Sequence, residues 1–285
     1  MKNVIVFMDM SKMDETVLRQ VKQLESVWGF DKICLMHYIE LQELTDDFST
    51  QFPDLDKPLE EILEEEILEM AIQAGFGKDE VFVKIHSKGG KDDLTHWVNT
   101  SEYNLCVFGK KVINPGSGIF ASKIARLIDK SILFTTETSR PNFDNVMLCV
   151  DFSPYSRKAV KFLNHFIPDS ASNFSLFHVY KVPAIYFPFV KQRSEKVVEE
   201  EKKKAEKALD SFREKHTNQP KSNAWLEYAD GQPSDKVIYN YARTHHVDLI
   251  VVGIKGKSDD DDLLIGSVAE KLIQSDRHVP VLLVQ

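Results

Sequence analysis

Short apolar runs rich in β-branched residues alternate along the chain with longer segments of helical periodicity. The run Leu249 to Val252 is typical: it is continuously apolar, as in a strand buried on both faces. In the second half we expect strands near residues 145–150, 173–179, 222–228, 248–252 and 280–284, and helices over 154–166, 194–215, 234–245 and 266–275. Strands that alternate with helices imply right-handed βαβ crossovers and a parallel sheet, so the pattern predicts an α/β fold.

The same landmarks occur twice in the same order. Two Asp-x-Ser elements follow apolar runs at Asp9 and Asp151, at an offset of 142 residues (151 − 9). Two further segments repeat: Cys34–Tyr38 parallels Ser175–Val179, and Leu105–Gly109 parallels Leu249–Gly253. We therefore expect a tandem duplication with domains at 1–139 and 140–285, separated by a proline-containing polar seam. Each domain is expected to be an open five-stranded parallel sheet with helices on both faces.

The strongest functional signal is a glycine pattern that follows the apolar run in the second half. Gly253-x-x-Gly256 is separated by nine residues from Gly266-Ser267, which opens an expected helix. Glycine permits unusual backbone angles and lets a ligand approach the main chain closely. The first N–H groups of a helix attract anions, and Ser267 adds a hydroxyl donor. This spacing suits a phosphate chain, although an ordinary strand–loop–helix turn would use the same glycines for geometry alone.

These motifs resemble the universal stress protein family in its tandem form, and the resemblance extends over essentially the whole chain. Besides the glycine pattern, it is carried by Asp151, by His178-Val179 at the end of a strand, and by Asp230-Gly231-x-Pro233 before a helix. It implies an adenine-nucleotide alpha hydrolase-like fold. It also implies, by similarity to the ATP-binding subgroup, that the second domain binds ATP through Asp151, Val179, Gly253, Gly256, Gly266, Ser267 and Val268.

The resemblance also implies a place for each part of the nucleotide. Asp151 and the backbone at Val179 would hold adenine, and Gly253 would lie near the ribose. Gly256, Gly266 and Ser267 would surround the phosphates. These positions lie where strands end, which is where open α/β sheets bind ligands.

The first half departs from this pattern. It keeps Gly109, but Val112 lies near the second glycine position and Ala121 replaces Gly266. Because these side chains obstruct close approach by phosphate, we expect a degenerate copy that supports the fold. Pairing of the final strands of the two halves would give an intramolecular pseudo-dimer, and further homodimerisation is left open.

An acidic run, Asp259–Asp262, lies inside the nine-residue spacer. Carboxylates this close to phosphates would repel them, and Lys255 and Lys257 would offset part of that repulsion. Three interpretations stay open: the aspartates point to solvent, they weaken nucleotide binding, or Mg²⁺ bridges them to phosphate oxygens.

Charge and composition narrow the choice of partner. The net charge of −8 argues against nucleic acid, and Asp9 comes too early for the apolar core of a signal peptide. No apolar run approaches membrane-spanning length, so we expect a cytoplasmic protein. Cys34, Cys106 and Cys149 lie in apolar strand-like runs, which indicates buried reduced thiols.

Enzyme motifs are missing from the sequence: it has no Gly-x-Ser-x-Gly elbow, no Walker lysine loop and no His-Glu-x-x-His helix. His37 and His178 occupy equivalent strand ends, where we expect partly buried, hydrogen-bonded side chains rather than catalytic bases.

The leading hypothesis is a nucleotide sensor whose nucleotide-bound state is recognised by a protein partner. The rival is a nucleotide-independent scaffold, and weak ATPase activity ranks third. The aromatic loop Val182–Val190 suits a lid, a partner contact or packing on its own domain.

Overall fold

The computed structural model describes residues 2–39, 57–87, 89–110, 123–139, 143–167, 174–182, 195–217, 223–257, 265–274 and 278–285. Several expectations fall outside these residues: those for Val112, Ala121, the acidic run Asp259–Asp262 and residues 183–190 of the aromatic loop. The chain divides into two compact units. Unit 1 comprises Met1–Asn142 with Asp276–His278, and unit 2 comprises Phe143–Ser275 with Val279–Gln285.

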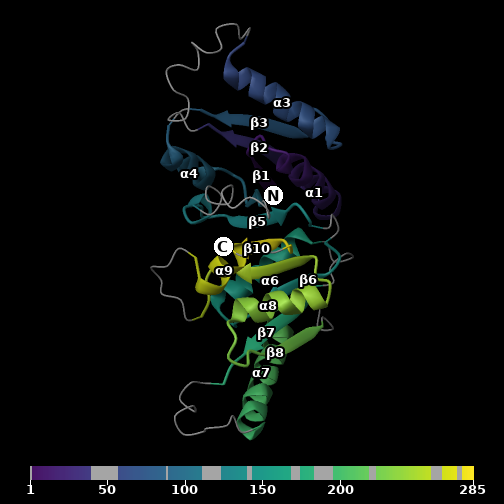
Figure 1. Cartoon of the computed structure of the whole chain (residues 1–285), viewed down its shortest axis with the longest axis vertical. Helices are drawn as coiled ribbons and strands as arrows, with labels where there is room; N and C mark the ends of the chain where they lie inside the picture. Colours follow the sequence, from purple (N-terminus) through teal and green to yellow (C-terminus); the bar gives the residue numbers. More distant parts are fainter. Residues whose placement is uncertain are drawn as a thin grey trace. The chain divides into compact units, whose positions relative to one another are not determined.

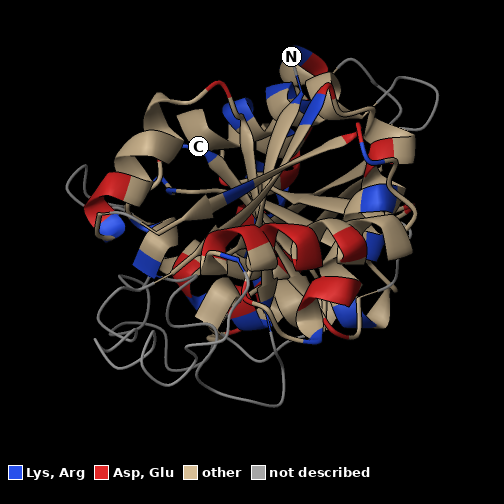
Figure 2. Cartoon of the chain, turned by 90° about the horizontal axis from the view of Figure 1, so that it is seen from above, with Lys and Arg blue, Asp and Glu red and all other residues tan. Residues whose placement is uncertain are grey.

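Unit 1 is an open parallel sheet in the order β3-β2-β1-β4-β5 with helices packed on it (Figure 1). Its described elements are β1 (Asn3–Met8), α1 (Met13–Trp28), β2 (Lys32–Tyr38), α3 (Leu59–Gln73), β3 (Val81–His86), α4 (Lys91–Thr100), β4 (Leu105–Lys110) and β5 (Ser131–Thr136). Helix α3 carries six exposed glutamates, and acidic residues are prominent in Figure 2, which views the chain from the α3 end of Figure 1.

Unit 2 repeats this strand order as β8-β7-β6-β9-β10, again with parallel pairing. Its described elements are β6 (Val146–Cys149), α6 (Pro154–Phe166), β7 (Phe174–Tyr180), α7 (Glu195–His216), β8 (Ala224–Tyr228), α8 (Ser234–Thr244), β9 (Leu249–Gly253), α9 (Ser267–Gln274) and β10 (Val281–Val284). The strands and helices expected in the second half are confirmed, because every observed bound lies within two residues of the expected one.

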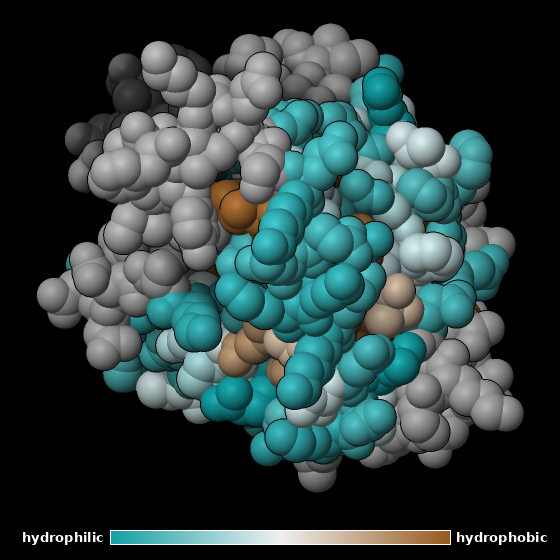
Figure 3. Space-filling view, turned by 90° about the horizontal axis from the view of Figure 1, so that it is seen from below, coloured by the Kyte–Doolittle hydropathy of each residue, from teal (hydrophilic) through white to brown (hydrophobic). Residues whose placement is uncertain are grey.

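The core of unit 2 explains why these segments form strands. Leu249, Val251, Leu282 and Leu283 have no exposed surface, so β9 and β10 are covered on both faces. Helix α7 instead buries one stripe, Ala205, Leu209 and Phe212. The side of the molecule on which α7 lies presents mostly hydrophilic residues (Figure 3), which agrees with a charged face of α7 that is exposed to solvent.

The strand order places a switch point between β6 and β9, where the chain direction along the sheet reverses. Crossovers from β6 lead one way to β7 and β8, while β9 and β10 lie on the other side. Helices that leave neighbouring strands in opposite directions open a crevice at the carboxyl ends of those strands. The fold therefore predicts a ligand site beyond the ends of β6 and β9.

A tight turn after β6 determines where Asp151 lies. Phe152 has φ of 66°, and Ser153 caps α6 by accepting a hydrogen bond of 3.1 Å from the Ser156 amide. Pro154 occupies the first turn of the helix, where its missing N–H costs no hydrogen bond. This turn holds Asp151 at the end of the strand, facing the crevice.

Candidate functional site

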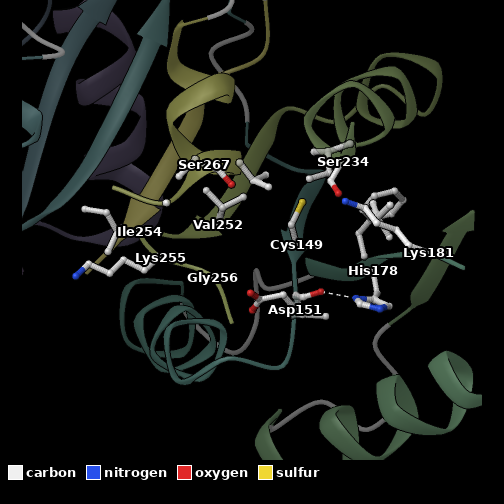
Figure 4. Close-up of a pocket in the computed structure, with 18 residues that line it drawn as sticks. Cys149, Asp151, His178, Lys181, Ser234, Val252, Ile254, Lys255, Gly256 and Ser267 are labelled. Carbon is white, nitrogen blue, oxygen red and sulfur yellow. Dashed lines mark hydrogen bonds between the residues drawn. The ribbon is translucent and has the colours of Figure 1, made fainter. Parts of the chain in front are cut away.

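A cavity of about 270 Å³ lies at the carboxyl ends of β6, β7 and β9 and at the start of α9 (Figure 4). Its volume is close to the lower end of the range usual for small-molecule sites. All the binding residues expected from the sequence line it: Asp151, Val179, Gly253, Gly256, Gly266, Ser267 and Val268. Tertiary structure thus brings together Asp151, Val179 and the glycine pattern from three distant parts of the chain.

Asp151 is held by hydrogen bonds to both carboxylate oxygens. Oδ1 accepts from the Ser153 amide at 3.0 Å and from the Ser156 hydroxyl at 2.7 Å, and Oδ2 accepts from the Lys257 amide at 2.7 Å. Burial by itself would raise the pKa of Asp151, but these hydrogen bonds outweigh it and lower the pKa below its ordinary value. The cavity therefore contains a fixed carboxylate that is ionised at neutral pH.

His178 is half-buried beside this carboxylate. Its Nδ1 lies 2.7 Å from the Val150 carbonyl oxygen, the contact drawn as a dashed line in Figure 4, and its ring lies 4.5 Å from that of Phe152. Burial lowers the pKa of His178, so the ring is neutral at pH 7. Because a carbonyl only accepts, Nδ1 carries the proton and Nε2 is left as an acceptor.

His37 makes the same contact in unit 1, with Nδ1 2.9 Å from the Met8 carbonyl oxygen. The expectation of partly buried, hydrogen-bonded histidines is confirmed at both strand ends. In both units this hydrogen bond joins the ends of two neighbouring strands, in addition to the hydrogen bonds of the parallel sheet.

The start of α9 supplies backbone donors, but Gly266 is not among them. The Gly266 amide donates to the Ile254 carbonyl at 2.7 Å, and the first bond of the helix runs from the Glu270 amide to the Gly266 carbonyl at 2.9 Å. The amides of Val268 and Ala269 precede that bond and have no acceptor within the helix. A phosphate group at this end would therefore meet amides beyond Gly266.

Gly253 departs from one of the two expectations made for it. Its φ lies outside the left-handed region, so the expectation that glycine supplies special backbone angles here is wrong. A Cβ at this position would lie 2.6 Å from Cβ of Tyr155 and 3.0 Å from its carbonyl carbon. Glycine is needed because α6 packs directly on the end of β9. Gly109 has the same role in unit 1, where a Cβ would meet Met13 at 2.7 Å and Val17 at 2.8 Å.

The charge of the cavity favours an anion. Among its lining residues in the part of the chain that the structure describes, Asp151 is the one carboxylate, and Lys181 and Lys255 are both cationic. Lys181, His178, Ser234 and Cys149 were not among the expected binding residues. Lys181 follows β7 directly, so its place at a strand end was a usable signal, whereas Ser234 reaches the cavity from α8 only through packing.

The described residues contain neither a metal-binding cluster nor a membrane-spanning helix. No group of three or more His, Cys, Asp or Glu side chains there is arranged to hold a metal ion. In the same residues, no helix has both the length and the apolar character needed to cross a membrane.

A family model described as the universal stress protein family matches residues 142–285. The chain belongs to the universal stress protein family. The resemblance seen in the motifs is therefore confirmed, and so is the α/β fold class with its open, mostly parallel sheets.

Individual proteins similar to this chain are also described as universal stress proteins. Universal stress protein YxiE of Bacillus subtilis (strain 168) is 28% identical over 152 residues, which cover 50% of this chain and 99% of that protein. Universal stress protein MJ0531 of Methanocaldococcus jannaschii is 39% identical over 59 residues, covering 21% of this chain and 34% of that protein. A universal stress protein from Archaeoglobus fulgidus DSM 4304 has a similar solved structure, with a TM-score of 0.67 at 15% identity over 99% of this chain and 98% of that one. At this identity the structural match supports the fold alone.

Proposed function

We propose that unit 2 of this universal stress protein binds an adenine nucleotide, ATP, and acts in the cytoplasm as a sensor or regulator whose nucleotide state a protein partner reads. The observation that supports it is the cavity at the switch point, which gathers the expected binding residues at one end of one sheet. Ligands of open α/β sheets bind at this place.

The two sides of the cavity suit the two ends of a nucleotide. Apolar side chains from the central strands, among them Phe177 and Val252, provide a surface for a planar base. The backbone at Val179 and the fixed carboxylate of Asp151 offer polar contacts to its edge, as the family resemblance implies. A carboxylate has about four lone-pair positions, so Asp151 can accept a further hydrogen bond beside the three it already accepts.

The phosphates would lie against the start of α9. There the Ser267 hydroxyl and the amides of Val268 and Ala269 offer donors to a phosphate, and Lys255 adds a positive charge to the cavity lining. Because Asp151 is the one carboxylate among the described lining residues, Mg²⁺ would be coordinated mainly by phosphate oxygens and water. We therefore propose binding with or without Mg²⁺.

The deciding experiment is calorimetric titration of nucleotide-stripped full-length protein with ATP, in the presence and absence of Mg²⁺. We expect saturable binding near one site per chain, with GTP as the control for base selectivity. Absence of binding under both conditions would reject this proposal and favour the nucleotide-independent scaffold. Conversion of bound ATP to ADP over hours would identify weak ATPase activity instead of passive binding.

A further inference from the structure

Ser156 contacts both the backbone and the side chain of Asp151. It is 2% exposed, and its hydroxyl makes two hydrogen bonds to the same residue. It accepts from the Asp151 amide at 3.0 Å and donates to Asp151 Oδ1 at 2.7 Å. A hydroxyl can do both at once because it is a donor and an acceptor. The backbone and the side chain of Asp151 are therefore fixed by one neighbouring group.

Unit 1 has an aspartate at the corresponding position. Asp14 lies 142 residues before Ser156 (156 − 14), the same offset that separates Asp9 from Asp151. Asp14 is also 2% exposed, and its carboxylate accepts hydrogen bonds from the Asp9 amide, at 3.1 and 3.2 Å to the two oxygens, and from the Met10 amide at 2.8 Å. Asp14 therefore accepts a hydrogen bond from the backbone of the strand-end aspartate, as the Ser156 hydroxyl does. Both units have this contact.

In unit 1 the group at this place is a carboxyl instead of a hydroxyl. In its ionised form it has no proton to give to Asp9, and its charge repels that of Asp9. Burial and the nearby Asp9 charge raise the pKa of Asp14 to about 7. The two strand-end aspartates also differ in exposure: Asp9 is exposed, whereas Asp151 is half-buried against the cavity.

The position of the Asp151 carboxylate affects the cavity wall because this carboxylate also holds the loop that follows β9. Its Oδ2 accepts from the amide of Lys257, directly beyond Gly256 in the cavity wall. If the carboxylate rotated away from Ser156, this bond would be lost, and the loop that faces the phosphates would lose its attachment to β6. A second negative charge at position 156 would in addition repel a polyphosphate.

We propose that Ser156 is a positioning residue of the nucleotide site in unit 2. The hydroxyl aligns Asp151 for contact with the base and with the Lys257 amide. This inference rests on the proposed ATP site, and it names a residue outside the set that the family resemblance supplied.

The experiment compares four variants of the full-length chain. Ser156→Asp imports the residue of unit 1, Ser156→Ala removes the hydroxyl, Ser156→Thr keeps it, and Asp14→Ser is the matched change in unit 1. We expect ATP affinity to fall about tenfold or more in both Ser156→Asp and Ser156→Ala, since a hydrogen bond to a charged group contributes at least roughly this much. Ser156→Thr and Asp14→Ser should bind ATP within about twofold of the parent chain, the size of an effect that leaves these bonds intact.

Amide hydrogen exchange at Lys257 provides a readout that needs no nucleotide. We expect faster exchange at this amide in Ser156→Ala and Ser156→Asp, with Ser156→Thr restoring protection and the rest of β6 and β9 unchanged. Unchanged Lys257 exchange in both variants would overturn the positioning role, whether or not ATP binds. Absence of ATP binding by the parent chain together with altered Lys257 exchange would reject the proposed function and retain the positioning role.

If Ser156→Asp fails to fold, the pair Ser156→Ala and Ser156→Thr decides the question. Equal ATP affinity and equal Lys257 exchange in these two variants would overturn the inference, because they differ in the hydroxyl and have similar backbone demands.

Discussion

The Asp151 carboxylate and the Lys257 amide form a hydrogen bond of 2.7 Å between residues 106 positions apart in the chain. The bond fastens the loop after β9 to the end of β6, across the switch point of the sheet. One wall of the cavity is thereby fixed relative to the other, so that the residues expected to contact a base and those expected to contact phosphates belong to one connected structure.

The first prediction removes this bond from the loop side. Lys257→Pro deletes the amide donor, whereas Lys257→Ala keeps it and removes only the side chain. We expect ATP affinity to fall about tenfold in the proline variant, because the hydrogen bond to a charged acceptor is lost and Asp151 is left with a missing partner. Titration calorimetry measures the difference. Equal affinities in the two variants would show that the amide contributes nothing to binding.

The second prediction concerns space at the start of α9. Gly266 is buried, and its amide bonds to Ile254, so a leucine side chain here would project into the region where phosphate is expected. We expect Gly266→Leu to abolish detectable ATP binding while the circular dichroism spectrum is retained. The matched change in the first half, Ala121→Leu, should leave ATP affinity unaffected. Loss of binding in both variants would contradict the division of labour between the two units.

The third prediction tests the packing role of the strand-end glycines. In Gly253→Ala the new Cβ would lie 2.6 Å from Cβ of Tyr155 and close to its backbone, which cannot move without shifting α6. In Gly109→Ala the close atoms belong to the side chains of Met13 and Val17, which have some freedom to adjust. We expect Gly253→Ala to cost about 1–3 kcal/mol in free energy of unfolding and Gly109→Ala to cost less. Urea denaturation checks the order, and a larger loss at Gly109 would refute it.

The fourth prediction is a pH dependence that arises from Asp14. Its pKa is raised from 3.8 to about 7 in the folded chain, with burial as the main cause and the Asp9 charge as the second. Between these values the folded chain holds a proton that the unfolded chain has released. The free energy of unfolding therefore falls as pH rises through this window, by at most about 1.4 kcal/mol per pH unit from this group.

The comparison that isolates Asp14 is the parent chain against Asp14→Ser, because other titrating groups are common to both. We expect the stability advantage of Asp14→Ser over the parent chain to grow from pH 5 to pH 7 and to level off above pH 8. Thermal unfolding at a series of pH values measures it. A constant difference across this range would show that Asp14 stays ionised in the folded chain.

Hydrophobic patterning was sufficient to predict the elements of unit 2 to within two residues. The reason is local: a strand such as β9 is buried on both faces and reads as a continuous apolar run, while α7 shows a narrow apolar stripe among charges. The glycine pattern likewise pointed to residues that line one cavity, because strand ends and helix starts of parallel sheets gather at one edge.

The role of Gly253 could not be read in the same way. A glycine at the end of a strand is compatible with unusual φ, with ligand approach and with helix packing, and the sequence does not distinguish among them. The φ of Gly253 excludes the first of these, and the contact with Tyr155, which depends on how closely α6 crosses β9, shows that packing requires a glycine here.

The sequence by itself determined which segments are strands and helices, that their landmarks recur, and which residues stand at strand ends, because these properties depend on short-range periodicity. Tertiary structure decided the strand order, the bond between Asp151 and Lys257, and the contrast between Ser156 and Asp14 as neighbours of a strand-end aspartate. These depend on which elements pack side by side and on the direction of individual donors and acceptors, and neither is encoded in the local pattern of apolar and polar residues.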